Sequence, residues 1–146
     1  MNFFRNQTKY ALMPLTEEVD GTTTIYAYVA AECEYIRQVN MEYEGKKFPG
    51  YEVVFKWNEK EDNITPEKDE NGNYTNSKIV MAIFDNSKPA KQKAQELNEQ
   101  IIKDKIKQTP LYQLKALTPI LRQKLEYANA LQEKHLIKTT NQEREM

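Results

Sequence analysis

The sequence predicts an α+β fold, with an antiparallel β-sheet of about four strands in the N-terminal half packed against two or three C-terminal helices. β-prone runs occupy residues 8–85, and apolar stripes at helical spacing occupy residues 88–136. Ser-Lys-Pro or Thr-Pro pairs mark the helix starts. We expect one domain over residues 1–138, with a sheet-rich part at 1–87 and a helical part at 88–138.

Two β-prone runs at the start of the chain predict the first hairpin. Residues 8–15 form the first run, and the alternating sequence TTTIYAYVA at 22–30 forms the second. The Asp20-Gly21 pair between them is a hairpin signal, although the five to six connecting residues suggest a loop longer than two residues.

Residues 30–43 fit two structures. One pattern continues the preceding strand through Ala31, Cys33 and Tyr35. The other follows helical spacing, and we favour the helix on this pattern: Val29, Cys33, Ile36, Asn40 and Tyr43.

Residues 51–57 form the clearest strand, and residues 77–85 are its expected partner. The 19 polar residues between them, 58–76, have no apolar period and predict a mobile hairpin loop. Within residues 51–57, we expect Glu52, Val54 and Lys56 on the solvent side and Trp57 on the side covered by helices.

Cap-and-proline pairs predict the helices. Ser87 with Pro89 begins the first, whose apolar stripe runs from Ala90 to Ile101. Residues 109–110 and 118–119 predict either two more helices or one helix bent at Pro119. The expected apolar faces beyond residue 110 are Leu111, Leu114 and Leu117, then Leu121, Leu125, Ala128 and Leu131. Residues 139–146 predict a frayed tail.

Charge divides the chain. Residues 1–87 hold nine Lys/Arg against fifteen Asp/Glu, a net −6, and residues 88–138 hold eleven against five, a net +6. The basic segment suits phosphate binding, docking on an acidic half of the same or another copy, or simple solvation. At ~100° per residue, Lys93, Lys103 and Lys107 share one side of the first helix, but Glu96 and Asp104 lie within the same arc. This mixture favours solvation first, protein docking second and nucleic acid third.

A nucleic-acid alternative keeps named residues. The Lys-rich segment 88–138 would contact phosphates, and aromatic side chains of the sheet would stack on bases. The residues in question are Lys93, Lys103, Lys107, Arg122, Tyr26, Tyr28 and Trp57.

No catalytic, cofactor or metal site is predicted. Cys33 and His135 are the only residues of their kinds, and no neighbouring base, orienting group or ligand set accompanies either. The alternation of Asp69 with Asn71 and Asn73 resembles the start of a calcium loop, but Gly72 and the missing glutamate do not fit. Phosphate-cradling glycine motifs are absent from the sequence.

These observations favour a small, non-catalytic, cytoplasmic interaction protein with a protein partner or a second copy of itself, no metal and no membrane. Lys outnumbers Arg 17 to 4, a composition typical of an AT-rich genome such as that of a low-GC bacterium or its phages and plasmids. With the divided charge and the long loop, this composition leads us to expect an accessory, regulatory or inhibitory factor of a phage or mobile element. The alternative is a nucleic-acid-binding protein, and the third hypothesis is an enzyme with a dispersed site.

Overall fold

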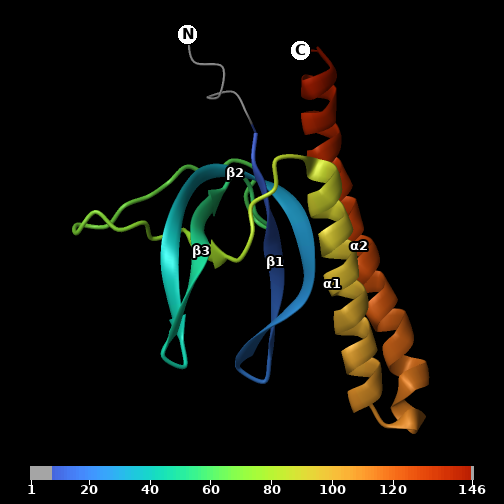
Figure 1. The fold of residues 1–146 in the computed structure, drawn as a ribbon. Helices are drawn as coiled ribbons and strands as arrows, with labels where there is room; N and C mark the ends of the chain where they lie inside the picture. The colour runs from blue at the N-terminus through green and yellow to red at the C-terminus, as the bar shows by residue number, and fades with distance from the viewer. Residues whose placement is uncertain (1–7, 146) are drawn as a thin grey trace. The chain divides into compact units, whose positions relative to one another are not determined.

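The computed structural model describes the backbone of residues 8–145 and the side chains of residues 8–136. The sheet has the order β1-β2-β3-β4, and two helices follow it (Figure 1), which confirms the predicted α+β class. The elements are β1 Tyr10–Val19, β2 Thr22–Tyr43, β3 Lys46–Phe55, β4 Lys78–Val80, α1 Ser87–Gln108 and α2 Leu111–Glu145.

The chain forms two compact units. The first combines the chain up to Leu12 with Ala31–Ala90, and the second combines Met13–Ala30 with the chain from Lys91 onward. The long strand β2 therefore contributes its first part to the second unit and its last part to the first unit.

Two-residue turns close both long hairpins. Asp20 and Gly21 have φ angles of 52° and 77°, and Glu44 and Gly45 have 51° and 78°. Positive φ at both central positions is the requirement of a type I′ turn, whose twist matches that of the flanking strands. The expected longer loop at Asp20-Gly21 is therefore wrong, because the preceding residues belong to β1, which continues to Val19.

Residues 30–43 form a strand, so the helix favoured for them is wrong. This part of β2 pairs with β3 from Cys33 opposite Phe55 to Tyr43 opposite Lys46. The register shifts between Cys33 and Tyr35, as a β-bulge does when it adds one residue to a strand. The extra residue breaks the period of two, and the resulting spacing of apolar residues imitates a helix.

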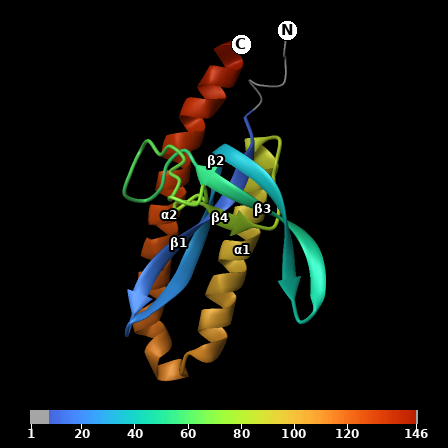
Figure 2. The ribbon, with the colours of Figure 1, turned by 90° about the vertical axis from the view of Figure 1, so that its left-hand side faces the viewer.

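The second unit depends on two buried amide side chains. The helices α1 and α2 run antiparallel and side by side (Figures 1 and 2). From α1, the Asn98 side chain accepts the Tyr28 N–H at 2.6 Å and donates to the Tyr28 carbonyl at 2.9 Å. From α2, the Gln132 side chain accepts the Ala30 N–H at 2.9 Å. Both amides are nearly inaccessible, at 3% and 2% exposure.

These amides form hydrogen bonds with backbone groups on an edge of β2 that, in the described part of the chain, has no neighbouring strand. Alternate residues of a strand direct their backbone groups to opposite sides. The Glu32 carbonyl accepts the Lys56 N–H at 3.0 Å, so even-numbered residues here face the β3 side of β2. The pairing with β3 begins only at Cys33, and so Tyr28 and Ala30 face helix side chains instead of a strand.

The apolar core of the second unit is built from small and medium side chains. Alanine at the helix surface lets the helices approach the hairpin closely, and leucine fills the remaining space. The buried apolar residues are Met13, Leu15, Ala27, Val29, Ala30, Ala94, Leu121, Ala128 and Leu136.

The C-terminal half contains two helices, because α2 continues through Pro119. Pro119 has no N–H to donate within the helix. Beside it, the Thr118 hydroxyl donates to the Leu114 carbonyl at 2.8 Å. The helix includes residues 139–145, for which a frayed tail was predicted; the side chains there lie outside the described residues, and the fraying stays a prediction.

The first unit has a core in which β3 is buried on both sides. Val53, Val54, Phe55 and Trp57 are each less than 5% exposed, so the expectation of a solvent side containing Val54 is wrong. β4 pairs with Tyr51–Val53, which makes residues 58–76 the loop of a β3–β4 hairpin, as predicted. Its mobility stays a prediction.

Replacing Asn98 with alanine should lower the free energy of unfolding by about 2–4 kcal/mol, because two backbone groups of Tyr28 lose their partner. Urea denaturation monitored by circular dichroism measures the change. Gln95→Ala on the exposed side of α1 is the control and should alter stability by less than about 0.5 kcal/mol. Equal stability of the two variants would show that the Asn98 bonds contribute nothing.

Candidate functional site

The lysines proposed for nucleic-acid binding lie on the exposed side of α1, interspersed with acidic groups. Lys93, Lys103 and Lys107 are all exposed. Lys93 forms an ion pair with Glu96 at 3.6 Å. Asp104 lies between the other two lysines in the sequence and accepts a hydrogen bond from Gln100 at 2.8 Å. This side of α1 carries both charges, as a solvated helix surface does.

Two other lysines hold the helices to the β1–β2 hairpin. Lys124 of α2 lies 2.7 Å from the Glu17 carboxylate, and Lys105 of α1 lies 3.9 Å from the same oxygen. Lys124 also lies over the Tyr26 ring, with its ammonium 5.8 Å from the ring centroid. All three charged side chains are about one quarter to one third exposed, so partial desolvation strengthens the attraction. These cations serve the fold of the second unit.

The aromatic residues named for base stacking do not form one exposed row. Trp57 is 3% exposed and belongs to the first unit. Tyr26 and Tyr28 are half-buried in the second unit, one beneath Lys124 and the other bonded through its backbone to Asn98. The cation beside Tyr26, Lys124, is already paired with Glu17.

The turn between α1 and α2 exposes two large apolar side chains. Leu111 is 86% exposed and Tyr112 is 82% exposed. Leu111 was expected on an apolar face with Leu114 and Leu117, which are half-buried, so the expectation is wrong for Leu111 alone. It stands at the first position of α2, before the buried face of that helix begins.

Local hydrogen bonds fix the shape of this turn. The Thr109 hydroxyl donates to the Lys105 carbonyl at 2.6 Å, and the Thr109 N–H donates to the Ile106 carbonyl at 3.2 Å. The Gln113 N–H donates to the Pro110 carbonyl at 2.9 Å. The two exposed side chains therefore project from an ordered backbone.

Lysines flank the apolar pair in the sequence. The segment 103–122 holds five Lys/Arg against one Asp, a net charge of +4. Lys115 and Arg122 are exposed and lie on the same side of α2 as Leu111 at ~100° per residue. We define the helical-turn surface as the exposed side chains of Lys103, Lys107, Leu111, Tyr112 and Lys115.

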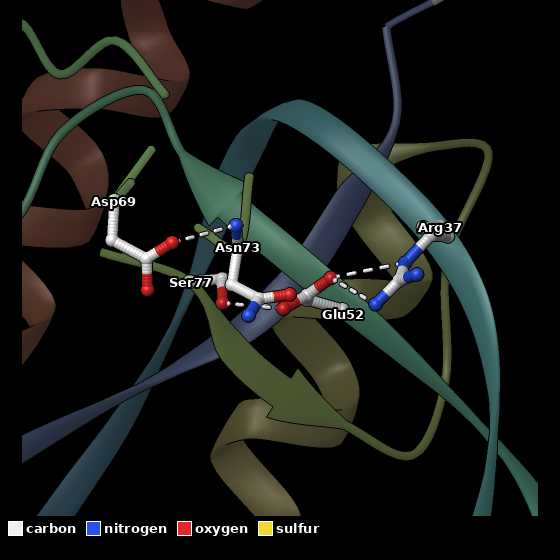
Figure 3. Close-up of polar contacts among 5 residues, drawn as sticks. All are labelled: Arg37, Glu52, Asp69, Asn73 and Ser77. Carbon is white, nitrogen blue, oxygen red and sulfur yellow. Dashed lines mark hydrogen bonds and ion pairs between the residues drawn. The ribbon is translucent and has the colours of Figure 1, made fainter. Parts of the chain in front are cut away.

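The acidic loop 58–76 of the first unit is closed by its own side chains (Figure 3). An Asp69 carboxylate oxygen accepts the N–H groups of Asn71 and Asn73 at 2.9 and 3.0 Å. The alternating polar residues that resemble a calcium loop thus form a turn. At the base of the loop, the Asn76 amide accepts the Glu67 N–H at 3.1 Å and donates to the Thr65 carbonyl at 2.8 Å.

The Glu52 carboxylate joins the strands at the base of the loop (Figure 3). It lies 2.8 Å from an Arg37 guanidinium nitrogen on β2 and accepts a 2.8 Å bond from the Ser77 hydroxyl. Its side chain is 14% exposed and that of Arg37 is 60% exposed. The Tyr74 ring in the loop lies against Tyr35, with ring centroids 4.2 Å apart. The C-terminal end of the loop is therefore anchored to the sheet through Tyr74 and the adjoining Ser77.

Cys33 is buried in β2, and His135 is half-buried in α2. The pKa of the Cys33 thiol is raised to about 12, chiefly by burial; the nearby Glu32 carboxylate also raises it, and Lys56 lowers it. The thiol is therefore protonated near neutral pH, whereas a nucleophilic cysteine needs its thiolate.

Among the described residues, no three potential metal ligands lie together. No helix in this part of the chain is apolar and long enough to cross a membrane. Comparisons with protein-family models, characterised proteins and solved structures found no match. The helical-turn surface and the acidic loop are the features from which a function has to be inferred.

Cys33 should resist alkylation by iodoacetamide at pH 8.5 in the folded protein and react readily in urea, because only the unfolded thiol ionises there.

The raised pKa of Cys33 also makes the stability of the fold depend on pH. Well below pH 9 the thiol is protonated in both states; as the pH rises through 9 and up to about 12, only the unfolded state loses the proton. Stability should therefore fall with rising pH in this window more steeply for the natural chain than for Cys33→Ala. Equal slopes would contradict the burial of the thiol.

Proposed function

We propose that the chain is a small, non-catalytic interaction protein that binds a partner protein through its helical-turn surface. The observation that carries the proposal is the exposure of Leu111 and Tyr112, at 86% and 82%, on a turn held by hydrogen bonds. Its proposed compartment is the cytoplasm.

Exposed apolar side chains are common on protein surfaces, so their arrangement matters more than their number. Leu111 and Tyr112 are adjacent and stand at the tip of a helical hairpin. Full burial of one such side chain contributes roughly 1.5–3 kcal/mol, so two supply a useful share of the affinity of a modest complex. Tyrosine is enriched among the residues that dominate interface energies.

The surrounding lysines support a partner with acidic groups. Lys103, Lys107 and Lys115 are exposed and have no hydrogen bond or ion pair to any residue that the structure describes. Charges at the rim of an interface raise the association rate and select complementary surfaces. A partner with carboxylates around an apolar pocket fits this surface best.

The proposed role is that of an accessory, regulatory or inhibitory factor of a phage or mobile element. The excess of Lys over Arg, 17 to 4, supports such a source, because this composition is typical of AT-rich genomes, including those of phages and plasmids. A binding factor of this kind needs a rigid scaffold and a recognition surface rather than a catalytic group.

A nucleic-acid role is the second candidate, and the exposed Tyr112 ring, with the exposed Lys107 and Lys115 close to it in the sequence, favours it. Aromatic rings with adjacent cations bind single strands by stacking and charge. Arg122 is the only arginine among residues 88–138, and Asp104 interrupts the lysines, so protein binding remains the stronger proposal.

A photo-crosslinking residue in place of Tyr112 tests the proposal in an extract of the source cells. It should yield a discrete protein adduct, and Leu111→Glu in the same chain should abolish the adduct by placing a charge in the apolar contact. The products are read by gel shift and mass spectrometry.

The same probe at Ala130 is the matched control, because this residue is exposed and lies on the same side of α2 as Tyr112, about 27 Å along the helix. It should give no such adduct. An adduct that survives Leu111→Glu would contradict the proposal, and one removed by nuclease would favour the nucleic-acid role.

A further inference from the structure

The structure contains two exposed segments of opposite charge, one in each unit. The helical-turn segment 103–122 carries a net charge of +4. The loop 58–76 carries six carboxylates against two lysines, a net charge of −4, and all six acidic residues are exposed. Each copy of the chain therefore carries a basic segment and an acidic segment whose net charges are equal in magnitude and opposite in sign.

The acidic loop is preorganised for binding. The Asn58 side chain accepts the N–H groups of Lys60 and Glu61, both at 2.8 Å, and the bonds of Asp69 and Asn76 hold the rest of the loop. Tyr74 anchors it to β2 through Tyr35. Hydrogen bonds within a loop reduce the conformational entropy that the loop loses when a partner docks.

Apolar side chains accompany the charge on both sides. Ile79 and Met81 follow the loop directly along the chain and are 52% and 61% exposed. At the helical turn, the exposed apolar side chains are those of Leu111 and Tyr112. Opposite charge together with exposed apolar area is the combination expected at a specific contact between proteins.

We propose that the partner of the helical-turn surface is the acidic loop of a second copy of this chain. The inference rests on the proposed function and names its partner. Contact between two helical turns would bring like charges together, as would contact between two loops, so turn-to-loop pairing is the arrangement that electrostatics favours.

This pairing sets the form of the assembly. The two surfaces in contact are different, so each copy retains one free turn and one free loop after a first contact. The contact either closes reciprocally into a two-fold dimer or continues into a ring or chain of copies. Association rises with protein concentration and weakens with added salt, because screening acts on the exposed charges.

A charge-swap experiment tests the inference by sedimentation velocity on the full chain at low ionic strength. The turn variant carries Lys103→Glu, Lys107→Glu and Lys115→Glu, and the loop variant carries Glu61→Lys, Glu67→Lys and Glu70→Lys. Either variant alone should sediment as a monomer, because its two surfaces then have the same sign. The equimolar mixture should recover the faster-sedimenting species of the natural chain. Leu111→Glu in the otherwise natural chain should abolish that species, although it leaves the lysines of the turn and the carboxylates of the loop unchanged.

A variant with Lys46→Glu, Lys47→Glu and Lys88→Glu, three exposed lysines outside both surfaces, makes the same change of charge and should associate as the natural chain does. Circular dichroism confirms that each variant is folded. A natural chain that is monomeric at every concentration, or charge-swapped variants that fail to associate when mixed, would overturn the inference. Neither result bears on the proposed function. That function is contradicted only if the probe at Tyr112 yields no protein adduct, or yields one that Leu111→Glu does not abolish.

Discussion

The fold of the second unit depends on how an uncovered strand edge finds hydrogen-bond partners. β2 extends beyond β3, and the backbone groups of Tyr28 and Ala30 on that edge would be buried without partners. Asn98 and Gln132 supply the missing donors and acceptors from two different helices. Because an unsatisfied buried polar group costs about 1–3 kcal/mol, these amides fix the position of both helices on the hairpin as well as stabilise it.

This constraint also decides what the lysines are free to do. Lys105 and Lys124 reach Glu17 because the amides hold their helices against β1 and β2, and Lys91 pairs with Glu133 between the helices. Lys103, Lys107 and Lys115, which flank the turn in the sequence, remain exposed. Electrostatic interactions therefore divide between those that assemble the unit and those that remain available for a partner.

The sequence predicted element types well wherever a local pattern determined them. The hairpin at Asp20-Gly21 and the strand at residues 51–57 both follow from local rules. The strand at 30–43 escaped prediction because the bulge between Cys33 and Tyr35 is a property of pairing with β3, which no local period records. The role of Asn98 escaped for the same reason, since its partner lies 70 residues away. Leu111 was predicted to lie on a buried face because residue spacing alone does not show where along α2 the buried face begins. Leu111 is the first residue of this helix, before that face.

Native-state hydrogen exchange of the Tyr28 and Ala30 amides, followed by NMR, tests most directly whether helix side chains close this edge. The account predicts protection as strong as that of the Cys33 amide, which bonds to the Lys9 carbonyl at 2.9 Å within the sheet. Exchange of both amides at the rate of an unfolded chain, while the Cys33 amide stays protected, would contradict it.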